Sequence, residues 1–239
     1  MSMRDVHGRG LVAVGDSITR GGGQSMHGLR MQSWALWLAE ALELPFTCLA
    51  RDGARAKDAL GGQVPRLRGP YELGCVYLGI NDVRVPGFEL APFVAALSEV
   101  VAAVGDCSER LLLVSMPPTL GAPRVPPHAI AAANEEIARL ARRHDAVLVT
   151  LETLAGAELV QPDRIHLTPR GEAHIALRAS RALGAAGVHA DERELLHALS
   201  PMTPGARVRW LLTGWAPFAA RYARLMAREA LERRRARRG

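Results

Sequence analysis

Short apolar runs recur along the chain, and longer stretches with apolar residues every three or four positions lie between them. Each run has four to six residues, is rich in Val, Leu or Cys, and is bounded by Gly, Pro or charged residues. Runs that are apolar on both faces are typical of buried strands in a parallel sheet. Five such runs occur, at residues 11–14, 46–50, 75–78, 111–115 and 146–151.

The stretches between these runs predict helices. Three apolar stripes at helical spacing mark their buried faces: Trp34, Trp37, Leu38, Ala41 and Leu42; Phe93, Leu97, Val100, Val101 and Val104; Ile130, Ala133, Ile137, Leu140 and Ala141. Ser33 can cap the first of these helices. Thr168 followed by Pro169 is a sharp start for a fourth helix, which should run to about Leu183 before Gly184.

The order of these elements predicts a doubly wound α/β sandwich with a parallel sheet, because strands and helices alternate. Right-handed crossovers then place the loops that follow the strands along one edge of the sheet. Functional sites of such folds form at that edge. Polar residues that directly follow a predicted strand are therefore the first candidates.

Two of these segments contain the parts of a nucleophilic site. Ser17 comes directly after the first strand, although the segment Gly15-Asp16-Ser17 alone favours a helix cap. A serine nucleophile needs a base that takes its proton near neutral pH, which suits the imidazole of His166. Asp163, three residues earlier, can reach the other ring nitrogen if the segment makes one turn. The alternative is that both are ordinary loop residues.

Two further strand ends offer hydrogen-bond donors. Asn81, in the segment of residues 79–82, can donate its amide to a developing oxyanion, although Asn and Asp also favour ordinary turns. Gly53, in the segment of residues 51–54, allows a backbone N–H to approach a ligand closely or simply forms a tight turn. Together, the four segments place a nucleophile, a base with its orienting carboxylate, and oxyanion donors at one edge of one sheet.

In their order along the chain, the four segments resemble the sequence blocks of the SGNH hydrolase superfamily, also called GDSL esterases/lipases. Val14-Gly15-Asp16-Ser17 resembles the nucleophile block, and Gly53 matches the glycine of block two. Residues 79–82 match the G-x-N-D block and residues 163–167 the D-x-x-H block. The resemblance covers about residues 11–183. Cys48 departs from it, since many members have Asn there, a change that would loosen the hydrogen bonding of that loop.

The resemblance implies a flavodoxin-like, three-layer α/β/α sandwich and hydrolysis of small-molecule acyl esters without a metal or other cofactor. Ser17, His166 and Asp163 would then form the catalytic triad. The backbone N–H groups of Ser17 and Gly53 and the side-chain amide of Asn81 would form the oxyanion hole. The sequence also contains no H-E-x-x-H, C-x-x-C or phosphate-loop motif.

Two other functions remain open from sequence. The same chemistry would serve acyl transfer to or from a carbohydrate or another alcohol, including sugar deacetylation. A non-catalytic binding module on the same fold is disfavoured by the presence of Ser17, Asn81, Asp163 and His166 together. Labelling with a fluorophosphonate probe would separate a module from an enzyme.

The net charge of +6 is concentrated at the C-terminal end. Residues 201–239 contain ten Arg and two Glu, or +8, whereas the other 200 residues contain 20 basic and 22 acidic side chains, or −2. A nearly neutral body does not favour nucleic-acid binding. The length of 239 residues suits one large domain with an extension. We expect a hydrolase domain over residues 1–187 and a basic helical extension over residues 188–239.

The extension carries an apolar stripe at Leu211, Trp215, Phe218, Tyr222 and Leu225. Pro217 predicts an interruption or kink of any single helix there. The pattern favours a helix docked on the hydrolase body, and it leaves open a homodimer contact or weak contact with an anionic membrane surface.

The N-terminal segment has no long apolar run, and no stretch of the chain reaches the ~18–20 apolar residues of a membrane-spanning helix. The three cysteines are an odd number without close spacing. Both features predict reduced thiols in a cytoplasmic protein.

Overall fold

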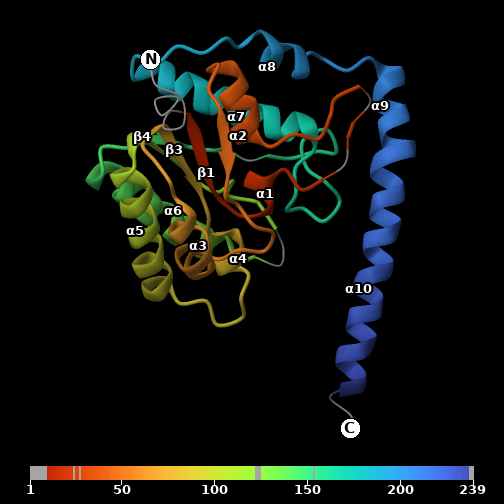
Figure 1. Cartoon of the computed structure of the whole chain (residues 1–239). Coiled ribbons are helices and arrows are strands. Elements are labelled where there is room, and N and C mark those ends of the chain that lie inside the picture. Colours follow the sequence, from red (N-terminus) through yellow and green to blue (C-terminus); the bar gives the residue numbers. More distant parts are fainter. Residues whose placement is uncertain (1–9, 24, 27, 122–124, 153, 237–239) are drawn as a thin grey trace.

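A sheet of five parallel strands in the order β2-β1-β3-β4-β5 lies at the centre of the molecule. The computed structural model describes residues 10–236 apart from residues 24, 27, 122–124 and 153. Helices cover both faces of the sheet (Figure 1). The predicted α/β/α sandwich with a five-stranded parallel sheet is therefore confirmed.

All five predicted strands are present, but their lengths differ from the apolar runs. They are β1 (Leu11–Gly15), β2 (Phe46–Cys48), β3 (Tyr71–Tyr77), β4 (Ser108–Val114) and β5 (Val147–Val149). The inner strands β3 and β4 begin before their apolar runs, because they pair with each other from Tyr71 and Ser108 onward. The edge strands β2 and β5 are shorter than their runs, since each pairs with only one neighbour.

The main helices form the two outer layers. One layer holds α2 (Trp34–Ala41) and α7 (Pro169–Ala185); the other holds α3 (Ala56–Gly62), α5 (Leu90–Asp106) and α6 (Pro127–Arg143) (Figure 1). The expected caps are present: Ser33 Oγ accepts from the Leu36 N–H at 3.2 Å, and Thr168 Oγ1 accepts from the Gly171 N–H at 3.2 Å. The predicted apolar stripes are buried in α5 and α6; in α2, Trp34, Leu38 and Ala41 are buried, whereas Trp37 and the C-cap Leu42 are half-buried.

The carboxyl ends of β1 and β3 lie side by side at one edge of the sheet. Gly15 is in register with Tyr77, and the short helices α1 (Ser17–Arg20) and α4 (Ile80–Val83) begin just beyond them. Gly79 turns the chain into α4 with a φ of 132°, and a Cβ there would lie 3.0 Å from the Met116 side chain. Only glycine fits that position without strain.

The packed body continues beyond α7. In α8 (Arg193–Ala198), Leu195 and Ala198 are buried. The buried Arg170 guanidinium of α7 donates to three backbone carbonyl oxygens at the end of α8. These belong to Ala198, Leu199 and Ser200, at 2.9, 3.1 and 2.7 Å.

A long helical rod follows α8 and runs beside the body (Figure 1). It consists of α9 (Pro204–Trp210), a π-helical turn η2 (Leu211–Trp215) and α10 (Ala216–Ala236). The interruption predicted at Pro217 takes the form of the wide turn directly before it: Ala216 N–H donates to the Leu211 carbonyl oxygen, five residues back. The wide turn lets the helix continue past a residue that cannot donate a backbone hydrogen bond.

Candidate active site

Ser17 is the first residue of α1, directly beyond the end of β1. Asp16 caps this helix, since its Oδ1 accepts from the Ile18 N–H at 2.9 Å. The helix lasts one turn and ends at Gly21, which takes a left-handed conformation with φ 86°. Ser17 is thus held between a buried strand and a capped turn, so both the cap and the candidate nucleophile predicted from Gly15-Asp16-Ser17 are present.

Gln63 fixes the end of the strand that carries Ser17. Its side chain is fully buried; Oε1 accepts from the Gly15 N–H at 3.0 Å, and Nε2 donates to the Gly15 carbonyl oxygen at 2.8 Å. These bonds hold the Gly15 backbone beyond the end of β2, where its carbonyl oxygen also accepts from the Arg51 N–H at 3.2 Å. The position of Ser17 therefore depends on a residue of the crossover that follows β2.

Asp163 and His166 lie in one tight turn. Asp163 Oδ1 accepts from the N–H groups of Ile165 and His166, both at 2.9 Å, and Arg164 takes a left-handed φ of 62°. The turn leaves the second oxygen, Oδ2, 2.6 Å from His166 Nδ1. The Asp163 carboxylate therefore reaches the His166 ring three residues later, as the sequence predicted.

The base of this turn is closed by the backbone. Val160 and Leu167 form an antiparallel bridge, and the Gln161 N–H donates to the His166 carbonyl oxygen at 2.8 Å. The Gln161 side chain donates to the Leu167 carbonyl oxygen at 2.7 Å. His166 therefore sits on a braced loop immediately before the Thr168 cap of α7.

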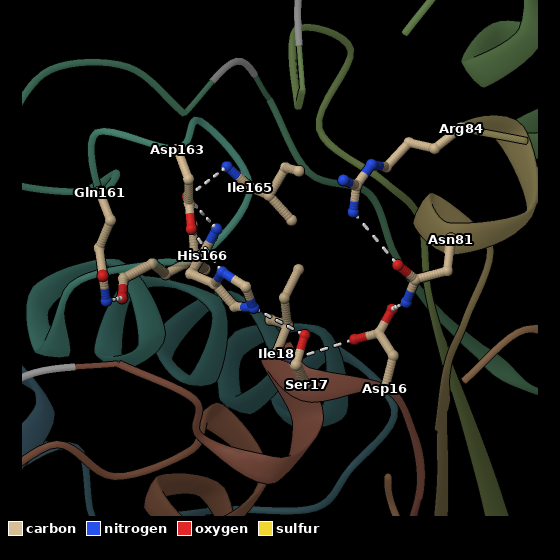
Figure 2. Close-up of polar contacts among 10 residues, drawn as sticks. Asp16, Ser17, Ile18, Asn81, Arg84, Gln161, Asp163, Ile165 and His166 are labelled. Atoms are coloured by element: carbon tan, nitrogen blue, oxygen red, sulfur yellow. Dashed lines mark hydrogen bonds and ion pairs between the residues drawn. The ribbon is translucent and has the colours of Figure 1, made fainter. Parts of the chain in front are cut away.

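The structure brings Ser17 and His166 together across 149 positions of the chain: Ser17 Oγ lies 2.8 Å from His166 Nε2. Figure 2 shows the imidazole between the Asp163 carboxylate and the Ser17 hydroxyl. Burial works to lower the pKa of His166, but the hydrogen bond and the charge of Asp163 outweigh it, so this pKa is raised. Burial would raise the pKa of Asp163, yet its hydrogen bonds to His166 lower it. The carboxylate is thus ionised when the imidazole holds a proton.

Asn81 lies on the other side of Ser17, in α4 (Figure 2). Its Nδ2 donates to the Ala54 carbonyl oxygen at 3.2 Å and, over a longer 3.4 Å, to Asp16 Oδ2. Arg84 donates to Asn81 Oδ1 at 3.3 Å, which turns the amide nitrogen toward the serine side. Gly53 lines the same pocket, with φ 71° and no atom within 4 Å of where its Cβ would lie.

Two buried carboxyl groups, those of Asp16 and Asp82, directly neighbour Ser17 and Asn81 in the chain, and their raised pKa values could not be predicted from the sequence. Burial raises the pKa of Asp16 to about 7, against the opposing effects of its bond to the Ile18 N–H and the charge of His166. Burial likewise raises the pKa of Asp82 to about 6, although its carboxylate accepts from the Ala56 N–H at 3.2 Å. The charge of Asp82 adds to the rise in the pKa of Asp16, and the charge of Asp58 adds to the rise in the pKa of Asp82.

The pocket around Ser17 has a volume of about 610 Å³. The four predicted blocks supply its floor and two of its sides. A further wall comes from α10, through Phe218, Arg221, Tyr222 and Leu225. The sequence predicted Phe218, Tyr222 and Leu225 as part of an apolar stripe but not as part of the site. Nothing local shows which surface a helix 50 residues after His166 will cover.

Across the described part of the chain, no three His, Cys, Asp or Glu side chains group in a way that would bind a metal ion. In the same residues, no helix has the length and apolarity needed to cross a membrane.

The four sequence blocks lie within a longer match to a known protein family. The model of the GDSL-like Lipase/Acylhydrolase family matches residues 13–174. The chain belongs to this family. It is thereby a carboxylic ester hydrolase, and the matched residues run from β1 to the first turns of α7. No curated protein matches the chain in a sequence search.

Solved structures show that other members of the fold have the same architecture. An α/β hydrolase, LAE5, from the metagenome of Lake Arreo, Spain, has a TM-score of 0.58 at 21% identity, over 74% of this chain and 95% of its own. The acetylxylan esterase Axe2 of Geobacillus stearothermophilus has a TM-score of 0.58 at 17% identity, over 74% of this chain and 94% of its own. This GDSL-like hydrolase therefore has the fold of known esterases.

Proposed function

We propose that this hydrolase cleaves acyl esters through a Ser17–His166–Asp163 triad. The observation that carries the proposal is the continuous line of short contacts from Ser17 Oγ to His166 Nε2, at 2.8 Å, and from His166 Nδ1 to Asp163 Oδ2, at 2.6 Å. His166 takes the serine proton as Ser17 Oγ attacks the ester carbonyl carbon. Asp163 holds the imidazole in the required tautomer and stabilises its protonated form.

The second half of the reaction uses the same groups in reverse. His166 gives its proton to the departing alcohol oxygen, which leaves an acyl group on Ser17. Water then attacks this acyl-enzyme, with His166 again as base, and releases the acid. Catalytic mutants of Axe2 replace a serine, an aspartate and a histidine, the same three residue types.

The oxyanion of each tetrahedral intermediate is stabilised by the N–H groups of Ser17 and Gly53 and by the Asn81 amide. The long contact from Asn81 Nδ2 to Asp16 is weak enough to be exchanged for the developing oxyanion. Arg84 keeps the amide in the donating orientation. Loss of one such donor in an oxyanion hole costs about 10²–10³-fold in rate.

Esters of carbohydrates are the second candidate substrates, because Axe2 is described as an acetylxylan esterase. Kinetic measurements on acetylated xylo-oligosaccharides and on alkyl and aryl acetates would separate the two classes. A purely binding role predicts no reaction with a fluorophosphonate probe.

The direct test is hydrolysis of p-nitrophenyl acetate by the wild type and by Ser17→Ala. The wild type should turn over the ester and react covalently with a fluorophosphonate, whereas Ser17→Ala should lose both, with a fall in kcat of roughly 10⁴-fold or more. Circular dichroism would show that the variant is folded. Unchanged turnover by Ser17→Ala would refute Ser17 as the nucleophile.

A further inference from the structure

A second cavity, of about 530 Å³, adjoins the catalytic pocket. One side is formed by residues around 154–164 together with Leu120, and the other by the helical rod. The rod contributes Trp215, Ala219 and Tyr222. Leu120 is buried, and Trp215, Ala219 and Tyr222 are half-buried, so the cavity is enclosed mainly by apolar side chains.

The rod is fixed to the opposite side of this cavity by two indole hydrogen bonds. The buried Trp210 donates from Nε1 to the Ala157 carbonyl oxygen at 2.7 Å. Trp215 donates from Nε1 to the Val160 carbonyl oxygen at 3.4 Å. Hydrogen bonds therefore connect the two sides of the cavity.

The two cavities meet at Gln161 and Tyr222, which line both. Gly53 and Asn81 line only the catalytic pocket, whereas Pro162 and Arg164 line only the second cavity. In Figure 2, Gln161, Asp163 and His166 lie on the side of Ser17 opposite to Asn81. The second cavity is thus reached past the histidine side of the site, away from the oxyanion donors.

The chemistry of ester cleavage indicates which part of the substrate lies on the His166 side. The carbonyl oxygen must point to Gly53 and Asn81, while the alcohol oxygen must come within reach of His166 Nε2, because the imidazole protonates it as it leaves. The carbon body of the alcohol therefore extends on the His166 side. We infer that the second cavity binds the alcohol portion of the ester, and that this alcohol is an aryl or alkyl alcohol; the inference rests on the proposed esterase function.

The lining sets the class of alcohol. Leu120, Leu154, Val160 and Trp215 belong to the apolar part of the lining, and Thr119, Gln161, Arg164 and Tyr222 form its polar part. Sugar hydroxyl groups that lie against the apolar part would lose water without replacement, which is unfavourable. A bicyclic aromatic or branched alkyl body would instead bury its surface, and a cavity of about 530 Å³ has room for it.

The inference is tested with two acetates that differ only in the alcohol: ethyl acetate and 2-(2-naphthyl)ethyl acetate. Both release a primary alcohol, so their chemical reactivity is matched. The wild type should show a kcat/KM about tenfold or more higher for the naphthyl ester, because the aryl group is buried. Ala219→Trp, which fills the cavity, should lower this ratio about tenfold. Ala223→Trp, one turn further along the same wall, should lower it in the same direction.

The matched control is Ala220→Trp, on the exposed side of the same helix and in the lining of neither cavity. It should keep the wild-type ratio. An unchanged ratio in both Ala219→Trp and Ala223→Trp would overturn the inference. A fall in the ratio of ethyl octanoate to ethyl acetate, with the alcohol ratio unchanged, would also overturn it and assign the cavity to the acyl chain. If no ester is hydrolysed in a Ser17-dependent way, the esterase proposal itself fails and the inference with it.

Discussion

Asp163 makes two different kinds of contact through its two oxygens. Oδ1 accepts from the N–H groups of Ile165 and His166 and so holds the turn, while Oδ2 contacts His166 Nδ1 and so holds the imidazole. One carboxylate therefore shapes the loop and orients the imidazole. This local relation was predictable from the spacing of three residues, because both partners belong to the same turn.

Replacing Asp163 by Asn separates these two contacts. Asparagine keeps an oxygen for the backbone N–H groups, so Asp163→Asn should remain folded. Its amide cannot hold the imidazole in the required tautomer, so kcat should fall by roughly 10³–10⁴-fold. The wild-type rate should rise with pH through the raised pKa of His166, as the base loses its proton, and the residual rate of the variant should rise at lower pH. A pH–rate profile that coincides with the wild type would contradict this role.

The raised pKa of Asp16 predicts an effect on stability. A carboxyl group with a pKa of about 7 in the folded state and an ordinary value of 3.8 when unfolded holds its proton more tightly in the folded state. Its contribution is present below the unfolded pKa and is lost as pH rises from about 4 to about 7. This behaviour was not visible in the sequence, because it depends on complete burial and on Asp82 nearby.

Asp16→Asn should remove this pH dependence and keep an oxygen acceptor for the cap of α1. The free energy of unfolding of Asp16→Asn, relative to the wild type, should therefore increase between pH 4 and pH 8 by an amount on the order of 3 kcal/mol. Urea unfolding of both proteins at several pH values measures this difference. A difference that is constant with pH would show that Asp16 titrates normally.

At the scale of elements, the ends of helices were more predictable than the ends of strands. The caps Ser33 and Thr168 are local signals, since each side chain bonds an N–H three residues further on. The early starts of β3 and β4 at Tyr71 and Ser108 reflect pairing between segments that are 37 positions apart in register. Propensity and apolarity do not contain that information, because it belongs to the neighbouring strand.

Gln63 is a second contact that could not be predicted from local sequence, here at the end of the strand that precedes Ser17. It completes the end of β1 from 48 positions away, and no feature of its own segment marks it. Gln63→Met preserves the approximate shape of the side chain but removes both hydrogen bonds to Gly15. The variant should lose about 2–4 kcal/mol of stability, because buried backbone groups are left without these partners.

The loss should also move Ser17, so kcat for p-nitrophenyl acetate should fall. Urea unfolding and ester kinetics measure the two effects. Wild-type stability would contradict the support of β1 by Gln63.

At the scale of the whole molecule, the short apolar runs and the four motif blocks predicted the body and its candidate site. They did not predict the position of the C-terminal rod. The stripe from Leu211 to Leu225 favoured a docked helix, and the structure places Phe218, Tyr222 and Leu225 of this stripe against the pocket around Ser17. The division at residue 187 and the homodimer and membrane contacts stay predictions. In α8, Leu195 and Ala198 are buried, and the carbonyl oxygens at its end accept from Arg170 of α7. Two shortened chains, one with α8 and one without it, therefore test where the folded body ends.

A chain that ends at Met202 should remain folded, since it keeps α8 and loses only the rod. Its melting temperature should fall by several degrees because the buried Trp210 and its hydrogen bond are lost, and Ser17 should still react with a fluorophosphonate. A chain that ends at Gly187 should be far less stable, because the buried Arg170 loses its carbonyl acceptors. Calorimetry of the two chains tests this order, and the reverse order would contradict it.

The π-helical turn has a consequence for changes in chain length. Trp210 and Trp215 are five residues apart, and side chains at that spacing in a regular α-helix would point about 140° away from each other. The wide turn lets both indoles bond the same strip of backbone between Ala157 and Val160. The wide turn holds one residue more than regular winding does, so deleting one residue from it would restore regular winding and leave the face of α10 unchanged. Phe218 and Tyr222 would then stay in the pocket, whereas the same deletion within the regular part of α10 would rotate the residues beyond it by about 100° and turn that wall of the enzyme away.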